Sequence, residues 1–390
     1  MTINTVTPLL LLGGKENGLS IARHLGRLGI PVRASGGATC WAMYSRYCRE
    51  AFAIPKREKL QTYWKQLLLG SDRRLDGHIV LALSDDAIEF VSAHRGLLKE
   101  RYILDDADAE LQHGFLDKMQ TLDMARKAGI DAPQHWQVRD EADLAVIKNQ
   151  VRFPVAVKPI QSHKFSAVFR KKLFIVDSSF DELKAKVRQA WENGISVFIV
   201  EMIPGPDSQL SSYYTYRTPD GRSLFHFTKS VIRRWPVNRG NACFHKTGWL
   251  PETAEAGARF FEQVGLKGLG NIEFKLDTRD GKLKIIEVNA RFTAAQELVR
   301  RAGVPIDLIV YCHLTGQAIP AAKQNGQELR LWYPLRDFMG FLELHKRGEL
   351  SLWGWLKSVT TTVPVLPLLS LSDPAPMFGA SLAVLHRITS

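Results

Sequence analysis

The sequence contains few cysteines, and none of them are spaced as in a metal or redox motif. Its 390 residues include four cysteines, Cys40, Cys48, Cys243 and Cys312, whereas metal and redox motifs need closely spaced pairs such as Cys-x-x-Cys. Scattered thiols of this kind are typical of a reducing compartment. We therefore expect a cytoplasmic protein without disulfides.

Signals for secretion and membrane insertion are also missing. No basic residue precedes the first apolar run, at 9–12, as a secretion signal would require. The charge-free stretch at 358–372 is shorter than the ~20 residues that span a bilayer. Pro364 and Pro367 would also interrupt a helix there. We expect no transmembrane segment.

The excess of positive charge is not arranged as in nucleic-acid-binding proteins. A net charge of +12 attracts anions in general, including nucleotides, acidic substrates and anionic membrane surfaces. Its clusters at 163–172 and 229–246 are not continuous runs interleaved with stacking aromatics. We therefore expect small anionic partners and no nucleic acid.

The glycines near the N-terminus lack the spacing of a dinucleotide site. Gly13, Gly14 and Gly18 form GGxxxG rather than GxGxxG, and the second expected strand ends in Arg33-Ala34 without an acidic residue. Nicotinamide binding is therefore not expected. The sequence also shows no Ser-His-Asp or Cys-His arrangement of a covalent catalyst.

Strands alternate with amphipathic helices in the first third of the chain. We expect strands at 8–14, 30–34 and 78–86 and helices at 19–29 and 87–98, which predicts a parallel sheet. The loops at 13–18 and 84–86 then lie at the ligand-binding edge of that sheet. In the second loop, Asp85-Asp86 fits either an ammonium site or a helix cap.

After Gly114 the pattern becomes mixed. Helices are expected at 115–129, 181–194 and 253–265, and strands at 154–159, 196–205, 211–218, 222–232, 268–277 and 282–291. From about residue 321 the sequence predicts a helical, proline-containing extension without recognisable chemistry.

The last two of these strands carry the strongest group of ligand-type side chains. Arg279-Asp280-Gly281 fits a three-residue hairpin loop with glycine in the left-handed conformation. That loop pairs Thr278 with Lys282, so Glu273 falls opposite Glu287. Because side chains alternate along a strand, Glu287, Asn289 and Arg291 share one face. The other face is expected to bury Ile272, Phe274, Ile286 and Val288.

Two carboxylates this close repel one another and are costly to bury without a cation. Magnesium meets that need, because it takes one or two carboxylates and completes its shell with phosphate oxygens and water. A solvated polar face of a hairpin is the alternative interpretation.

The segments IEF (272–274) and IIEVNAR (285–291) resemble the metal-binding hairpin of the ATP-grasp superfamily, a resemblance that covers roughly residues 8–320. It implies an α/β and α+β fold with an N-terminal Rossmann-like domain at 1–113. Small and large ATP-grasp lobes then follow at 114–197 and 198–320, with an extension at 321–390. The resemblance further implies that Glu273, Glu287 and Asn289 hold Mg²⁺, or Mn²⁺ in its place, against the phosphates of ATP.

The resemblance assigns other residues to the nucleotide. Lys118 in LDKMQ and Lys158 in PVAVKP are similar to the family lysines that contact ATP. The segment VFIVEMIPGPD resembles the linker between the two lobes. It implies that Glu201, Met202 and Ile203 meet adenine and that Asp207 lies near the ribose.

Three basic residues are implied to act in catalysis. Arg291 would steady phosphoryl oxygens, a role that suits its forked donors. Lys229 and Arg233, in TKSVIRRWP, resemble a Lys-x-x-x-Arg stretch that borders the phosphates in the branch related to D-aspartate ligase. One departure is the stretch after Lys158, IQSHKFSAVFRKK, which lacks the glycines that many members have. Ser162, His163 and Lys164 are expected to donate there instead.

By resemblance, the chain is therefore expected to be a ligase that activates a carboxylate as an acyl phosphate and joins it to an amine. Two alternatives stay open at this point. One is an ATP-grasp protein that binds nucleotide without ligase turnover. The other is a basic protein that binds anions or a membrane surface. Neither the substrates nor the oligomeric state is indicated by the sequence.

Overall fold

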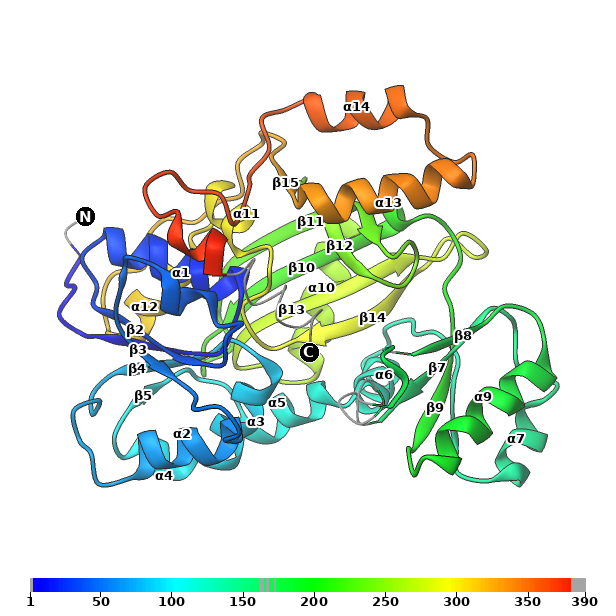
Figure 1. The fold of residues 1–390 in the computed structure, drawn as a ribbon, viewed down its shortest axis with the longest axis horizontal. Coiled ribbons are helices and arrows are strands. Elements are labelled where there is room, and N and C mark those ends of the chain that lie inside the picture. The colour runs from blue at the N-terminus through cyan, green and yellow to red at the C-terminus, as the bar shows by residue number, and fades with distance from the viewer. Residues whose placement is uncertain (1–2, 161–164, 166–167, 172, 380–390) are drawn as a thin grey trace.

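The computed structural model describes residues 3–160, 165, 168–171 and 173–379. Its strands form one parallel sheet and two antiparallel sheets, each covered by helices (Figure 1). This combination confirms the predicted α/β and α+β class. Within the described ranges, no helix is long and apolar enough to cross a membrane.

The parallel sheet is built from the N-terminal part of the chain and has helices on both faces. Its strand order is β3-β2-β1-β4-β5, with β1 Leu9–Leu12, β2 Val32–Gly36, β3 Cys48–Ala53, β4 Ile79–Ala82 and β5 Ile103–Leu104. Leu9 and Leu11 pack in the same core as α1 (Glu16–Arg27). Leu10 and Leu12 pack with α2 (Leu60–Leu69), α3 (Asp85–Ala93) and α4 (Arg95–Lys99). Alternation along a doubly covered strand explains why all four leucines are buried.

Two short helices lead to the second sheet. They are α5 (Ala109–Leu116) and α6 (Lys118–Lys127). The prediction of one continuous helix over 115–129 is therefore wrong. Asp117 adopts an extended conformation, and its side chain accepts hydrogen bonds from the Met119 and Gln120 amides, which starts a new helix.

The second sheet is antiparallel, with the order β6-β9-β7-β8. Its strands are β6 His135–Val138, β7 Val155–Pro159, β8 Phe174–Val176 and β9 Val197–Glu201. Helices α7 (Glu141–Ile147) and α9 (Phe180–Glu192) cover one face. On the other face, Ala156, Phe198 and Val200 join a core shared with α6 and the third sheet.

The third sheet is antiparallel, with the order β14-β13-β10-β11-β12-β15. Its strands are β10 Leu210–Arg217, β11 Ser223–Trp235, β12 Asn241–Thr247, β13 Gly268–Leu276, β14 Leu283–Asn289 and β15 Arg330–Trp332. Helix α10 (Pro251–Gln263) packs on one face with Tyr213 and Ile272. On the other face, Tyr214 and Phe227 share a core with α1 and with α12 (Ile306–Leu314), which follows α11 (Gln296–Arg301).

The turn between β13 and β14 differs from the predicted three-residue loop. Asp277 and Lys282 close the turn, with the Asp277 amide donating to the Lys282 carbonyl over 2.9 Å. The buried Asp277 carboxylate accepts hydrogen bonds from Arg279 and Lys284. These bonds, above all the one from Arg279, lower the pKa of Asp277. Gly281 has the expected positive φ, +69°.

The C-terminal segment is tied into the third sheet. Strand β15 pairs with β12, and Val365 forms a parallel bridge with Leu331. Helix α13 (Pro334–Lys346) lies along the sheet, whereas α14 (Leu352–Thr360) lies farther out (Figure 1). The chain then returns to α1, where Arg23 Nε lies 2.8 Å from Asp373 Oδ2 in a buried ion pair.

Candidate active site

Glu273 and Glu287 face one another on adjacent strands. They are register partners between β13 and β14, as predicted, although the turn is one residue off the predicted register. A β-bulge restores the pairing, because Phe274 pairs with Ile285 and both Ile286 and Glu287 lie opposite Glu273. Consequently Ile285, rather than Ile286, packs in the core, and Ile286 lines a cavity beside Glu287. The prediction that Ile286 is buried on the opposite face is wrong for this reason.

The two carboxyl groups have opposite pKa shifts. Burial and the charge of Glu287 raise the pKa of Glu273. Burial alone would raise the pKa of Glu287 as well, but nearby cations outweigh it and hold this pKa below its usual range. These cations are Lys118, Lys158 and Arg291. Glu287 is therefore the carboxylate that stays ionised, and Glu273 is the one that gains most from an added cation.

Lys118 is the first residue of α6, and its Nζ lies 3.5 Å from Glu287 Oε2. A cation in the first turn is unfavourable to the helix dipole, and no acidic side chain occupies that turn. Local helix stability therefore does not explain this lysine, whereas its contact with the acid pair does.

Lys158 lies near the end of β7, on the second sheet. Burial and the charge of Lys118 lower the pKa of Lys158 to about 8, while Glu287 acts in the opposite direction. The structure thus brings Lys158, Lys118 and Glu287 into one electrostatic group, although they belong to three different elements.

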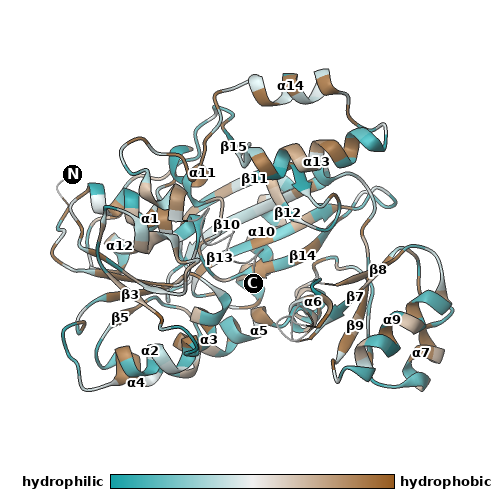
Figure 2. Ribbon diagram, viewed as in Figure 1, coloured by the Kyte–Doolittle hydropathy of each residue, from teal (hydrophilic) through white to brown (hydrophobic). Residues whose placement is uncertain are grey.

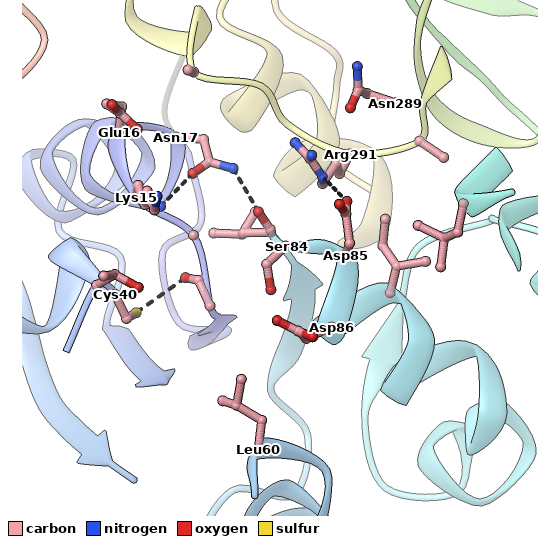
Figure 3. Close-up of a pocket in the computed structure, with 18 of the residues that line it drawn as sticks. Lys15, Glu16, Asn17, Cys40, Leu60, Ser84, Asp85, Asp86, Asn289 and Arg291 are labelled. Atoms are coloured by element: carbon pink, nitrogen blue, oxygen red, sulfur yellow. Dashed lines mark hydrogen bonds and ion pairs between the residues drawn. The ribbon is translucent and has the colours of Figure 1, made fainter. Parts of the chain in front are cut away.

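Arg291 follows β14 and reaches toward the first sheet. Its Nε donates to Asp85 Oδ1 over 2.8 Å (Figure 3). Asp85 opens α3, but the residue that caps this helix is Ser84, whose hydroxyl accepts from the Ala87 amide. Ser84, rather than Asp85 or Asp86, therefore caps α3. Asp85 instead binds the Arg291 guanidinium.

Lys229 lies in the same cross-strand row as the acid pair. The row runs from Glu287 through Glu273 and Ser212 to Lys229, so these side chains share one face of the sheet. Lys229 is buried, and its Nζ donates to Ser212 Oγ over 3.0 Å. Burial lowers its pKa, and Glu273 opposes that shift.

Arg233 does not join this group. The register of β11 against β12 shifts after Val231, where Arg233 pairs with Phe244. This irregularity turns Arg233 to the opposite face, where its Nε and Nη2 bind Asp337 over 2.7 and 3.0 Å. Arg234 takes the side nearer the acids and influences the pKa values of Glu273 and Lys158.

The residues expected to meet the adenosine begin at the last residue of β9, Glu201, and continue along the linker that follows it. The amide of Met202 donates to the Pro154 carbonyl, and the carboxylate of Glu201 pairs with Arg279. Asp207 is buried and accepts a hydrogen bond from Arg234 Nε over 2.6 Å. These hydrogen bonds and ion pairs fix the linker to the rest of the protein. Ile203 adds a buried apolar side chain.

A cavity of about 1220 Å³ separates the acid pair from the first sheet. Lys118, Glu287, Asn289 and Arg291 line one wall, and the loops at 13–17, 37–40 and 84–86 line the other. Asn17 fixes that second wall, because its Nδ2 donates to the carbonyl of Leu83 (Figure 3) and to that of Phe292. The two loops predicted at the sheet edge thus open onto the same space as Glu287 of the hairpin.

Some predicted residues lie outside the described part of the chain. Ser162, His163 and Lys164, expected to donate to phosphates after Lys158, fall in this group.

Sequence reasoning missed two polar residues next to the acids on β13. Asn271 is buried opposite Asn289, whose Nδ2 lies 3.4 Å from Asn271 Oδ1. Lys275 is buried as well, and its Nζ donates to the Ile203 and Gly205 carbonyls over 2.9 and 2.7 Å. The same alternation that selected Glu273 could have found both. Alternation could not have found Arg234, because only the register shift in β11 brings this side chain to the face that carries Glu273.

The acid pair and Asn289 suit a partial shell for a hard cation. Among the described residues, no three His, Cys, Asp or Glu side chains gather as a metal-binding group. Two carboxylates and an amide oxygen, each giving one ligand, leave half of an octahedron to other oxygen donors, as Mg²⁺ bound to a nucleotide requires. The raised pKa of Glu273 fits a site in which a cation would relieve the repulsion between the acids.

One protein family matches part of the chain. The ATP-binding domain of the carbamoyl-phosphate synthase L chain matches residues 251–312. This stretch includes both Glu273 and Glu287 and the whole turn between them.

Two curated ligases are similar over about half the chain. The D-aspartate ligase of Enterococcus faecium is 25% identical over 224 residues, covering 55% of this chain and 53% of the ligase. The D-alanine–D-alanine ligase of Pseudomonas fluorescens is 25% identical over 187 residues, covering 45% of this chain and 53% of that ligase. The chain thus spans about half the length of the curated relatives it matches.

Solved structures extend the likeness to most of the fold. N5-carboxyaminoimidazole synthetase from Staphylococcus aureus, complexed with ADP, superposes with a TM-score of 0.64 at 14% identity, over 89% of this chain and 87% of that one. At 14% identity the match shows a similar fold and nothing further. The fold and the sequence matches together confirm the predicted resemblance to the ATP-grasp superfamily and to its carboxylate–amine ligases.

Proposed function

We propose that the protein is an ATP- and Mg²⁺-dependent ligase that activates a carboxylate as an acyl phosphate and joins it to an amine. The observation that carries this proposal is the acid pair Glu273–Glu287, of which Glu287 lines the large cavity together with Lys118 and Arg291. The similarity to two amide-forming ligases supports the same reaction class.

Glu273, Glu287 and Asn289 would hold the metal ion. Mn²⁺ would suit the same oxygen donors, because both ions favour octahedral oxygen ligation. The ion would supply charge neutralisation for the phosphates of ATP.

The cations around the acid pair would orient the nucleotide. Lys158 and Lys118 belong to different elements and are both coupled to Glu287, so they are suited to grip phosphate oxygens from two sides. Lys229 and Arg234 add positive charge beside Glu273. Arg233 is assigned to structure rather than chemistry, because Asp337 engages it.

At the far end of this site, the linker would receive the adenosine. Ile203 would offer apolar contact to the base, and Glu201 and Met202 polar groups to its edge. Asp207, which Arg234 holds in place, would lie near the ribose. Lys275 keeps the linker in position through the Ile203 and Gly205 carbonyls.

The proposed reaction needs no protein nucleophile. A carboxylate oxygen of the substrate attacks the γ-phosphorus of ATP, the bond to the bridging oxygen breaks, and ADP leaves. The nitrogen of the amine then attacks the acyl carbon, and phosphate leaves with the C–O electron pair. Such chemistry depends on positioning and charge stabilisation. Arg291, whose guanidinium Asp85 orients, would stabilise the transferring oxygens.

We also propose that the predicted domains divide the work. Residues 1–113 would contact the carboxylate and amine through the loops at 13–17 and 84–86, because these loops line the cavity. The lobes at 114–197 and 198–320 would enclose the nucleotide, and residues 321–390 would brace the large lobe through β15 and Asp337.

A screen of ADP release across small carboxylates and amines, with Mg²⁺ present, tests the proposal. A productive pair should stimulate ADP release, and Glu287→Gln should reduce it by about 100-fold or more, as expected when a group that positions the phosphates is lost. Asp280→Asn is the matched control, because this exposed carboxylate lies on the turn of the same hairpin.

Two outcomes would contradict the proposed reaction. ATP binding without substrate-stimulated ADP release from any pair would indicate a nucleotide-binding protein without ligase turnover. Anion binding that needs no Mg²⁺ and falls steeply with salt would indicate a general electrostatic surface. Full activity in Glu287→Gln would contradict the metal assignment.

A further inference from the structure

The outer helices of the C-terminal segment expose an unusual amount of apolar surface. On α13, the residues Leu335, Phe338, Met339 and Leu342 follow helical spacing along one stripe, and Leu335 is 76% exposed. On α14, Leu352 and Trp353 are 53% and 77% exposed. We call the exposed apolar side chains of α13, α14 and residues 361–372 the outer apolar face.

Helix α14 does not belong to any core of the protein. None of its residues is buried. Trp355 attaches it to α13, with its ring stacked 5.0 Å from the ring of Phe341. Figure 1 shows α14 standing outside the third sheet, and the colouring of Figure 2 shows hydrophobic residues along it. A helix with this composition leaves its apolar surface in water unless something covers it.

The segment that follows α14 also exposes apolar side chains. Val363 is 92% exposed and Leu371 is 96% exposed. These two exposed side chains contribute nothing to the folded core. Their exposure therefore indicates contact with another molecule.

The charges around this face favour an anionic partner. From residue 350 to residue 372 the sequence has no Asp or Glu, and Lys357 is its only charged residue. At the end of α13, Lys346 and Arg347 are balanced by Glu343 and Glu349, and Arg347 pairs with Glu343. The net positive charge of the face therefore rests on Lys357, within a chain that carries +12. The part of a surface that binds another protein is usually surrounded by a polar rim. An anionic bilayer instead attracts cations to its headgroups and accepts apolar side chains below the headgroups.

We propose that the outer apolar face docks on an anionic lipid bilayer and inserts shallowly, with α14 lying in the plane of the interface. Trp353 suits the boundary between headgroups and acyl chains, because tryptophan is enriched there. The face lies apart from the cavity, whose lining includes no residue of α13 or α14. Docking on lipid and turnover are therefore separable.

Flotation of the full-length protein with lipid vesicles tests this inference. Vesicles of phosphatidylcholine with one third phosphatidylglycerol should carry the protein upward, and pure phosphatidylcholine should do so less. The double variant Leu352→Ser, Trp353→Ser should partition at least about tenfold more weakly, because two apolar side chains lose their burial in lipid.

Matched controls separate the face from general hydrophobicity and charge. Leu97→Ser with Trp249→Ser removes a leucine that is 55% exposed and a tryptophan that is 54% exposed, both outside the outer apolar face, and should bind vesicles like the wild type. Lys357→Glu should weaken binding to anionic vesicles more than Lys99→Glu does. All variants should keep the wild-type thermal midpoint and basal ADP release.

Three results would overturn the inference. Equal flotation of the two double variants would mean that the face does not insert. Equal binding to neutral and anionic vesicles would remove the role of charge. Absence of vesicle binding, together with a dimer that Leu352→Ser, Trp353→Ser dissociates, would assign the face to a second copy of the chain.

Discussion

At the scale of single residues, the acid pair is defined by what lies around it. Glu273 and Glu287 face one another, yet the pKa of Glu273 is raised and that of Glu287 is lowered. The difference arises because Lys118, Lys158 and Arg291 act on Glu287, whereas Glu273 is held deeper in the sheet beside Ser212. Without a bound cation, the site therefore favours one charged carboxylate.

The lowered pKa of Lys158 makes nucleotide binding depend on pH. The ammonium form exists below about pH 8, and only that form attracts the phosphates. The apparent Kd for ATP should be flat below this pH and rise above it, by up to about tenfold per pH unit. Titration of a fluorescent ATP analogue between neutral and alkaline pH would measure the rise.

Lys158→Arg is the control for that pH dependence, because arginine stays charged throughout the range. The variant should bind ATP with a flatter alkaline profile. Lys275 also has a pKa lowered to about 8 by burial, and it remains in the variant. An unchanged profile in Lys158→Arg would therefore assign the titration to another group.

At the scale of elements, two irregular strands decide which side chains face the site. The hydrophobic alternation was enough to predict the hairpin, its acid pair and the strand that carries Lys158 near its end. It could not predict the bulge at Ile286 or the register shift after Val231. The bulge offsets the one-residue difference that the Asp277 turn introduces between β13 and β14, whereas the shift in β11 lies against β12. Neither irregularity leaves a local pattern in the sequence.

The bulge predicts an order of stability for two adjacent isoleucines. Ile285→Ala should cost about 2–5 kcal/mol of unfolding free energy, because Ile285 is buried in the core with Phe274. Ile286→Ala should cost less than about 1 kcal/mol, because this side chain lines the cavity. Urea denaturation would compare them. A regular hairpin without the bulge would give the reverse order.

The register shift predicts different roles for two adjacent arginines. Arg233→Ala should lower the unfolding free energy by about 3–5 kcal/mol, because Asp337 would stay buried without its partner. The protein that remains folded should keep its ATP affinity. Arg234→Ala should instead weaken ATP binding by about tenfold, the equivalent of one lost charge contact.

Urea denaturation and ATP titration of both arginine variants would test this assignment. Loss of ATP binding in folded Arg233→Ala, with normal binding in Arg234→Ala, would restore the role that the sequence motif suggested for Arg233.

At the scale of the whole molecule, the C-terminal segment holds distant parts together. Arg23 and Asp373 form a buried pair, and Asp373 also accepts from the Ser45 hydroxyl and the Arg46 amide. The sequence predicted helices here but no long-range contacts, because a single buried aspartate carries no pattern. The parallel sheet of the first third was easier to predict, since it follows from the alternation of strands with amphipathic helices.

Removing that link should loosen the end of the chain. Asp373→Ala should lower the unfolding free energy by about 3–5 kcal/mol, because Arg23 would remain buried and unpaired. The segment after Pro367 should also become sensitive to limited proteolysis. Asp181→Ala, which breaks an exposed pair with Lys184, should cost less than about 1 kcal/mol. Equal effects of the two variants would argue against the link.

The most direct measurement of the central claim is calorimetric titration of ATP with and without Mg²⁺, in the wild type, Glu287→Gln and Asp280→Asn. The wild type and Asp280→Asn should bind ATP at least about tenfold more tightly when Mg²⁺ is present. Glu287→Gln should lose this Mg²⁺ dependence while keeping its fold. Unchanged, Mg²⁺-dependent ATP binding in Glu287→Gln would contradict the assignment of the acid pair as the metal site.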